Sequence, residues 1–287
     1  MIVTILLLIL GVLGLAFTSV LFSTARQRGE LRPTLESVVL GAITNFFDTL
    51  GIGSFATTTA WIKLRGLVPD SFIPATLNAG HALPTVAQAF IFIQLVSVDP
   101  KLLAACIVAA VAGAIVGAPI VVRLPVRVVQ GVVGLALLIA SGLYALSNLG
   151  LMPAGGDALS LPAGPLAVAV GAHFVLGALM TFGIGLYAPS LILLSLLGLN
   201  PIAAFPIMMG ACAFLMPVCG MPFVRAERIN LHVVIGLALG GIPLVLIAAF
   251  LVKSLPLVTL RWGVVVVVLY AAVLLLRSAM SPTPHQK

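Results

Sequence analysis

Residues 41–55 read GAITNFFDTLGIGSF, and residues 177–201 read GALMTFGIGLYAPSLILLSLLGLNP. Each stretch lies within a long apolar run, and each run is interrupted by the same tripeptide, Gly-Ile-Gly. Paired glycines weaken the interior of a helix and permit a sharp turn. The two stretches therefore predict two broken helices, over residues 35–62 and 163–198.

A constant shift of 132 residues along the chain relates the two broken helices. Apolar strings align by chance at many shifts, whereas glycines and prolines do not. The identical pairs at this shift are Gly51 with Gly183, Ile52 with Ile184, Gly53 with Gly185, Gly66 with Gly198, Pro69 with Pro201 and Pro74 with Pro206.

These identities predict an internal duplication. The expected units are an N-terminal helix and loop (1–34), a first repeat (35–148), a linker (149–162), a second repeat (163–278) and a tail (279–287).

The composition indicates that the protein uses lipid as its main solvent. The chain is 62% hydrophobic and 7% charged, with a mean hydropathy of +1.29, whereas a soluble domain carries about 25% charged residues. Such a chain is expected to be an all-α protein with many membrane-spanning helices. Its apolar segments are 2–22, 35–62, 71–97, 102–122, 127–147, 163–198, 202–222, 231–252 and 257–277.

The first segment is expected to be a retained membrane helix. A secretory signal begins with basic residues, and none precedes this segment. A cleaved signal is the alternative. The net charge of +7 does not indicate nucleic-acid binding, since the basic residues are scattered between apolar runs.

The basic residues predict the topology through the positive-inside rule. If every segment spans the membrane and the N-terminus is outside, the 14 basic residues divide 8 inside to 6 outside. If the two broken helices are instead re-entrant hairpins, only Lys101, Lys253 and Arg261 lie outside. The inside set is then Arg26, Arg28, Arg32, Lys63, Arg65, Arg123, Arg127, Arg225, Arg228, Arg277 and Lys287.

The second topology predicts about seven full spans and two hairpins, with the N-terminus outside and the C-terminus cytoplasmic. Each repeat then holds one hairpin and three spanning helices. Because three is odd, the second repeat is inverted relative to the first, and the glycine tips approach each other near the midplane. This arrangement is typical of secondary transporters.

Both hairpin tips are candidates for an anion site. A half-helix that begins after the glycines presents unpaired N–H groups and the positive end of a helix dipole, and Ser54 is expected to cap the first one. The alternative is that the glycines only allow close helix packing. The candidate residues are Asn45, Gly51, Gly53 and Ser54 in the first tip and Thr181, Gly183, Gly185 and Tyr187 in the second.

Asp48 is a carboxylate deep within an apolar segment, where a charged group costs about 3 kcal/mol on insertion scales. We weigh two roles for it: a proton carrier, or an anchor that hydrogen-bonds exposed backbone at the turn. A carboxylate next to an anion site repels the substrate unless it is protonated.

A polar stripe follows the first hairpin, formed by Asn78, His81, Thr85 and Gln88, which the helical repeat places on one face. At the shift of 132 their counterparts are the small residues or proline Gly210, Ala213, Pro217 and Gly220. The stripe predicts a hydrogen-bonding cavity wall, with interhelical polar contacts as the alternative. His81 is a second candidate for proton coupling, and His173 is either a cavity residue or a packing residue.

Sulfur side chains share one further helical face: Met209, Cys212, Met216 and Cys219. Such ligands suit Cu(I), but methionine and cysteine are also common packing residues. We expect no metal site and no cofactor.

The quoted hairpins, together with PATLNAGHALPT at 74–85, resemble the TauE/SafE family of sulfite exporters and anion permeases. The resemblance covers nearly all of the chain after the first helix. It implies export or exchange of sulfite, sulfoacetate or other organosulfonates across the bacterial inner membrane. The implied partners are a small sulfur oxyanion and the lipid bilayer, with a homodimer left open and no nucleic acid.

Two other functions stay open from the sequence. One is an anion channel. The other is an intramembrane hydrolase that uses Ser54 with His81 or His173, although the chain has no Gly-x-Ser-x-Gly elbow. No phosphate-binding Gly-x-x-x-x-Gly-Lys-[Ser/Thr] loop is found either. We therefore expect a non-enzymatic transporter that is not driven by ATP.

Overall fold

The computed structural model describes residues 1–51, 53–121, 156–225, 229–252 and 257–280, with scattered residues between 127 and 151. Within these ranges the secondary structure is helical apart from an isolated bridge between Ala158 and Leu199. The helices are α1 (Ile2–Arg28), α2 (Leu35–Thr49), α3 (Ser54–Arg65), η1 (Asp70–Phe72), α4 (Ile73–Gly80), α5 (Ala82–Leu95), α6 (Pro100–Val121), α8 (Ala163–Met180), α9 (Tyr187–Leu196), α10 (Ala204–Arg225), α11 (Leu231–Val252) and α12 (Leu257–Met280).

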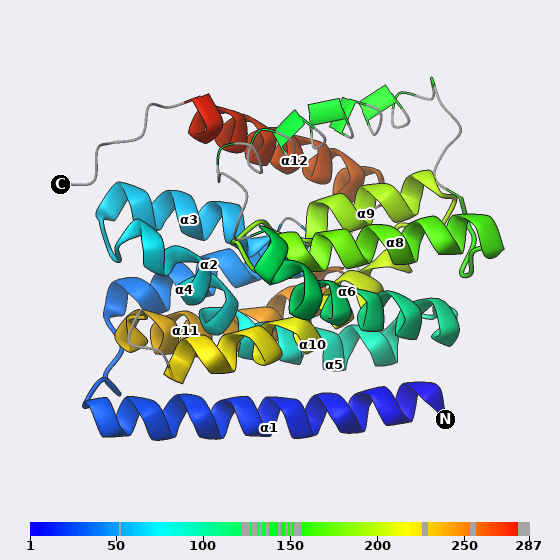
Figure 1. Ribbon diagram of the computed structural model, residues 1–287. Coiled ribbons are helices and arrows are strands. Elements are labelled where there is room, and N and C mark those ends of the chain that lie inside the picture. Colours follow the sequence, from blue (N-terminus) through cyan, green and yellow to red (C-terminus); the bar gives the residue numbers. More distant parts are fainter. Residues whose placement is uncertain are drawn as a thin grey trace.

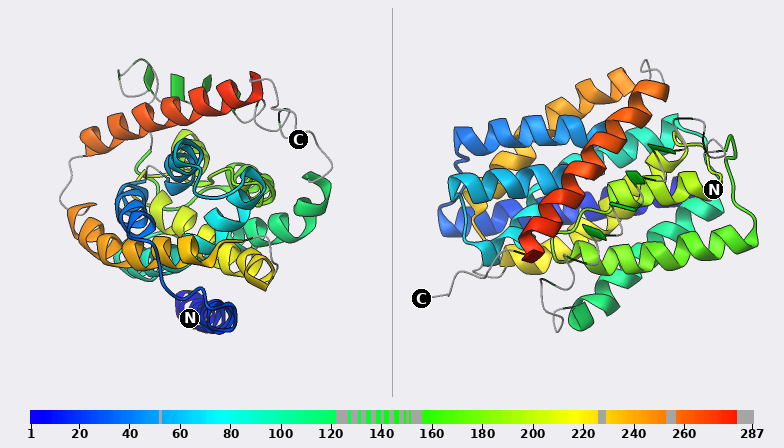
Figure 2. Two further views of the ribbon diagram at one scale, coloured as in Figure 1. Left: turned by 90° about the vertical axis from the view of Figure 1, so that its left-hand side faces the viewer. Right: turned by 90° about the horizontal axis from the view of Figure 1, so that it is seen from above.

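The helices form a bundle in which α1 and α12 lie on opposite sides (Figures 1 and 2). In the described part of the chain, α1, α8, α10 and α11 are long and apolar enough to cross a membrane. The all-helical class that the composition predicts is therefore confirmed, and the helices suit a membrane location. The predicted segment 127–147 and the tail after Met280 lie mostly outside the described residues.

The first broken helix is an antiparallel pair, α2 and α3, which we call the first hairpin. Gly51 and Gly53 in its turn have φ of +90° and +87°, a region that side chains with a Cβ rarely adopt. At the open end of the hairpin, the carboxylate of Glu36 accepts hydrogen bonds from Trp61 (3.1 Å) and Arg65 (2.9 Å). The start of α2 and the end of α3 therefore lie on the same side of the protein.

The second broken helix forms an equivalent pair, α8 and α9, which we call the second hairpin. Gly183 in its turn has φ of +83°. At its open end the amide of Asn200 donates to the carbonyl of Ala158 (2.8 Å), and Ala158 also bridges to Leu199. The chain before α8 and the chain after α9 are thus joined at one end.

The open ends of the two hairpins lie at opposite ends of α1. Ile2, at the start of α1, shares a surface hollow with Leu159, which precedes the second hairpin. Beyond the other end of α1, Arg32 accepts a hydrogen bond from His232, whose carbonyl accepts one from Ser37 at the start of the first hairpin. A helix of 27 residues is about 40 Å long, close to the full thickness of a bilayer.

The polar stripe lies on two helices and not on the single helix expected over 71–97. A break at His81 separates α4 from α5. Pro84 explains it, because proline has no N–H to donate to the carbonyl of Gly80 four residues earlier. The first apolar segment, expected to end near residue 22, continues to Arg28, where Gly29 ends the helix in the left-handed conformation (φ +69°).

Candidate functional site

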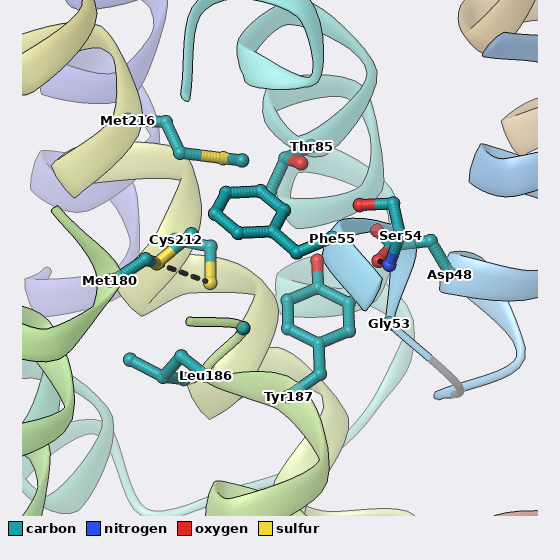
Figure 3. A pocket seen from close by; sticks show the side chains of 11 residues that line it. Asp48, Gly53, Ser54, Phe55, Thr85, Met180, Leu186, Tyr187, Cys212 and Met216 are labelled. Atoms are coloured by element: carbon teal, nitrogen blue, oxygen red, sulfur yellow. Dashed lines mark hydrogen bonds between the residues drawn. The ribbon is translucent and has the colours of Figure 1, made fainter. Parts of the chain in front are cut away.

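The turns of the two hairpins meet around one small cavity (Figure 3). Its volume is about 10 Å³ for the centre of a water-sized sphere, which is room for roughly one water molecule. In this state the cavity cannot hold an oxyanion. Its walls are formed by Asp48, Gly53, Ser54, Phe55, Thr85, Met180, Gly185, Leu186, Tyr187, Cys212 and Met216.

Contacts across this cavity are reciprocal. A Cβ atom on Gly53 would lie 3.8 Å from Cβ of Tyr187, and a Cβ atom on Gly185 would lie 3.5 Å from Cβ of Phe55. Gly53 and Gly185 differ by 132 residues, as do Phe55 and Tyr187. The same surface is therefore used by both hairpins, as in an interface with twofold symmetry.

Asp48 caps the N-terminus of α3. Its Oδ1 accepts a hydrogen bond of 2.5 Å from the amide of Ser54. The expectation that Ser54 is the cap is wrong: Gly53 is the N-cap residue and Ser54 is the first helical residue. A carboxylate reaching across the turn can do the work of a capping side chain, because it satisfies a free N–H and neutralises the positive end of the helix dipole.

Gln88 on α5 connects the two hairpins. Its Nε2 donates to Oδ2 of Asp48 (2.9 Å) and to Oγ1 of Thr49 (2.9 Å) in the first hairpin. Its Oε1 accepts a 2.5 Å hydrogen bond from the hydroxyl of Tyr187 in the second. Gln88 and Asp48 are 0% and 3% exposed, so neither group has bulk water as an alternative partner.

His81 lies between α4 and α5 and contacts both helices of the first hairpin. Its Nδ1 is 3.0 Å from Oδ1 of Asn45, and its Nε2 is 3.0 Å from Oγ1 of Thr58. It is fully buried and is not part of the cavity wall. These bonds hold α3 to the rest of the first hairpin.

His173 makes an equivalent contact in the second hairpin. Its Nδ1 lies 2.8 Å from the carbonyl of Ala169, and its Nε2 lies 3.0 Å from Oγ of Ser190. Because a carbonyl only accepts, Nδ1 carries the proton and Nε2 accepts from Ser190. Ser190 is the counterpart of Thr58 at the shift of 132, so each short half-helix bonds one histidine through the same position.

The structure brings some of the predicted site residues together and leaves others apart. Asp48, Gly53, Ser54, Thr85, Gly185 and Tyr187 line the cavity, and Gln88 contacts it through Asp48 and Tyr187. Asn78 donates to the carbonyl of Met180 (3.2 Å), and Thr181 donates to the carbonyl of Ala178 (2.7 Å). Outside the cavity wall lie Asn45, Gly51, Asn78, His81, His173, Thr181 and Gly183.

The sequence prediction missed the apolar wall of the cavity, including Phe55, Met180 and Leu186. The repeat offers a signal for Phe55, because it is the counterpart of Tyr187, and for Met180, because it is the counterpart of Asp48. Leu186 carries no chemical signal in the sequence.

The sulfur side chains are divided between the cavity and the surrounding core. Sγ of Cys212 lies 3.5 Å from Sδ of Met180, and Met216 lines the same cavity, whereas Met209 and Cys219 do not. Among the described residues, no group of three or more His, Cys, Asp or Glu side chains could hold a metal ion.

No protein-family model, curated protein or solved structure matches the chain. The cavity and the two hairpins are therefore the features that bear on the function.

Proposed function

We propose that the protein is a secondary transporter of small anions, built from two inverted repeats and working by alternating access around the cavity. The observation that carries this proposal is the meeting of two broken helices, from opposite ends of the bundle, at one small cavity that is lined by polar groups of both tips and by apolar side chains. Interrupted helices in matching positions of two halves hold the substrate in many secondary transporters. Irregular backbone at membrane depth is tolerated only where protein or a watery cavity satisfies it.

The contacts between helices, like the duplicated sequence, support an inverted repeat. The reciprocal pairs Gly53–Tyr187 and Gly185–Phe55 relate the two tips by an approximate twofold axis. The same relation holds for the long helices, because α2 of the first repeat packs closely on α11 of the second, and α8 of the second packs closely on α6 of the first.

The preference for an anion follows from the N-termini of α3 and α9 at the cavity. In the closed state Asp48 supplies the negative charge at α3. A substrate anion can take that place once Asp48 is neutral, so the proton is the favoured coupling ion. Sulfite, sulfoacetate and other organosulfonates, the substrates implied by the TauE/SafE resemblance, are the first candidates. The membrane potential favours exit of an anion from the cytoplasm by about 2.3 kcal/mol per charge per 100 mV.

Neither alternative function gains support from a contact. A hydrolase needs its nucleophile next to a base, but Nε2 of His81 bonds Thr58 and Nε2 of His173 bonds Ser190; neither bonds Ser54. A channel needs a continuous path, whereas the space between the tips has room for roughly one water molecule.

Anion binding is expected to raise the melting temperature of the purified protein. A ligand at 100 times its dissociation constant adds about 2.7 kcal/mol of stability. The panel is sulfite, sulfate, thiosulfate and sulfoacetate, each as its sodium salt, with sodium chloride at matched ionic strength as the control. Equal melting temperatures throughout, together with no counterflow of labelled sulfite into proteoliposomes, would contradict the proposal.

Side-specific labelling is expected to place the open ends of the hairpins on opposite faces of the inner membrane. In a chain with Cys106, Cys212 and Cys219 replaced by alanine, a cysteine at Lys63 should react only from the cytoplasmic side. A cysteine at Lys101 should react only from the outside. Labelling of both positions from the same side would rule out the inverted arrangement.

A further inference from the structure

The hydrogen bonds of Gln88 form a chain with one allowed direction. The hydroxyl of Thr49 donates to the carbonyl of Asn45 (2.8 Å), which can only accept, so Oγ1 of Thr49 has no proton to give to Gln88. An ionised Asp48 also only accepts. Both N–H groups of Gln88 must therefore face the first hairpin, and its carbonyl must face the second, where the hydroxyl of Tyr187 donates to it.

A proton on Asp48 disrupts this chain. Both carboxylate oxygens already accept an N–H, Oδ1 from Ser54 and Oδ2 from Gln88. Whichever oxygen takes the proton becomes a poor acceptor for the N–H group that points at it. Gln88 cannot compensate by rotating its amide through 180°, because its carbonyl would then face Oγ1 of Thr49, whose proton is already used. A buried polar group that loses its partner is costly, which favours separation of the tips.

We propose that Gln88 is a latch that holds the two hairpin tips together while Asp48 is ionised and releases them when Asp48 takes a proton. The latch gives the proposed transporter its coupling step. It rests on the proposed function only for the consequence of opening, which is access of the anion to the cavity. Gln88 is a positioning residue here, since it acts on the second hairpin through Tyr187.

Asp48 is the member of the latch that gains or loses the proton, and its neighbours come from several other helices. The titratable side chains that act on it are Tyr187 from α9 and Cys212 from α10. Ser54 from α3 faces it with its amide and its hydroxyl, Gln88 from α5 with an N–H group, and Tyr187 with its hydroxyl. His81 is directed instead to Asn45 and Thr58.

Cys212 offers a native reporter of the latch, because it lines the cavity and is 1% exposed. The test measures the rate at which a small methanethiosulfonate reagent labels Cys212 in proteoliposomes without transported anion, from pH 5 to pH 9. The other two cysteines, Cys106 and Cys219, are replaced by alanine. Rates are expressed as the ratio of variant to parent at each pH, which cancels the pH dependence of the thiol in the variants that keep Asp48.

In the parent chain, Cys212 is expected to be protected while Asp48 is ionised and to become accessible as the pH falls. Gln88→Leu and Tyr187→Phe should label about tenfold to a hundredfold faster than the parent at pH 8, the change in population expected from losing one strong hydrogen bond. Their advantage should disappear at low pH, where the parent is also released. Asp48→Asn should label faster than the parent at pH 8, because an amide in place of the carboxylate cannot satisfy both N–H donors as an anion does.

Ser195→Ala is the matched control, since Ser195 is buried on α9, has no hydrogen-bond partner among the described residues and lies outside the cavity wall; it should label like the parent. The latch is overturned if Gln88→Leu keeps the pH profile and rate of the parent, or if all variants, Ser195→Ala included, label faster. Because no anion is present, these outcomes are independent of whether the anion panel stabilises the protein.

Discussion

Gly177→Leu is expected to prevent the close pairing of α6 with α8 and to yield little folded protein. A Cβ atom on Gly177 would overlap the carbonyl of Ala110, and one on Gly113 would overlap the carbonyl of Phe174. Backbone atoms in a helix cannot move aside as a flexible side chain can. Overpacking of a core typically costs about 1–3 kcal/mol, and a leucine against the facing backbone falls at the upper end. The measurements are the melting temperature and the monodisperse fraction in detergent.

Gly171→Leu is the control for this prediction. Gly171 lies on the same helix, α8, but a Cβ atom added to it would have no heavy atom of the described residues within 4 Å. Leucine has a higher helix propensity than glycine by roughly 0.5–1 kcal/mol, so this variant should be as stable as the parent or more so. If both variants lost the same amount of stability, the contact between α6 and α8 would not be the cause of the defect.

The sequence predicted the two helix breaks because glycine leaves a chemical signature that apolar residues do not. It did not reveal which glycine each turn requires. Gly51, Gly53 and Gly183 have positive φ, whereas Gly185, the counterpart of Gly53, does not. The identity of a residue permits a conformation without imposing it, so the two turns differ although their tripeptides are the same.

The polar stripe was predictable as a shared face, but its contacts were not. Helical spacing predicts that His81 and Gln88 lie on one side, and both are fully buried. Spacing cannot tell that Gln88 reaches Asp48 and Tyr187 while His81 reaches Asn45 and Thr58, because these pairs depend on how the helices approach each other. The break at Pro84 was available from the sequence, since proline cannot donate to the preceding turn.

The structure shows Asp48 in one of the two roles that the sequence offered for it. The sequence offered a proton carrier or a backbone anchor. In the structure the carboxylate anchors the amide of Ser54, and the same bond places its charge where a bound anion would be stabilised. The anchor is therefore part of the candidate site and does not compete with it, while the proton role stays a prediction.

Gly51→Val is expected to abolish transport while the protein still inserts and folds. The backbone at Gly51 has φ of +90°, and a Cβ atom there would lie 3.1 Å from the ring of Phe205. A β-branched residue at positive φ is a strained outlier, with a cost of order 1–3 kcal/mol. The turn would relieve this strain by moving, and Asp48, three residues earlier, would lose its alignment with the amide of Ser54. The measurement is sulfite counterflow in proteoliposomes at equal amounts of inserted protein.

Gly66→Val separates loss of the site from loss of stability. Gly66 also has a left-handed backbone, with φ of +63°, but a Cβ atom added there would meet no heavy atom within 4 Å in the part of the chain that the structure describes. Gly66 ends α3 at the far side from the cavity. Valine should therefore strain both positions, whereas only the change at Gly51 disturbs the meeting of the two hairpins. Full transport by Gly51→Val would remove the first turn from the mechanism. Equal losses in both variants would attribute the defect to strain in the hairpin and not to the cavity. A loss confined to Gly51→Val is the outcome that the convergence of the two half-helices requires.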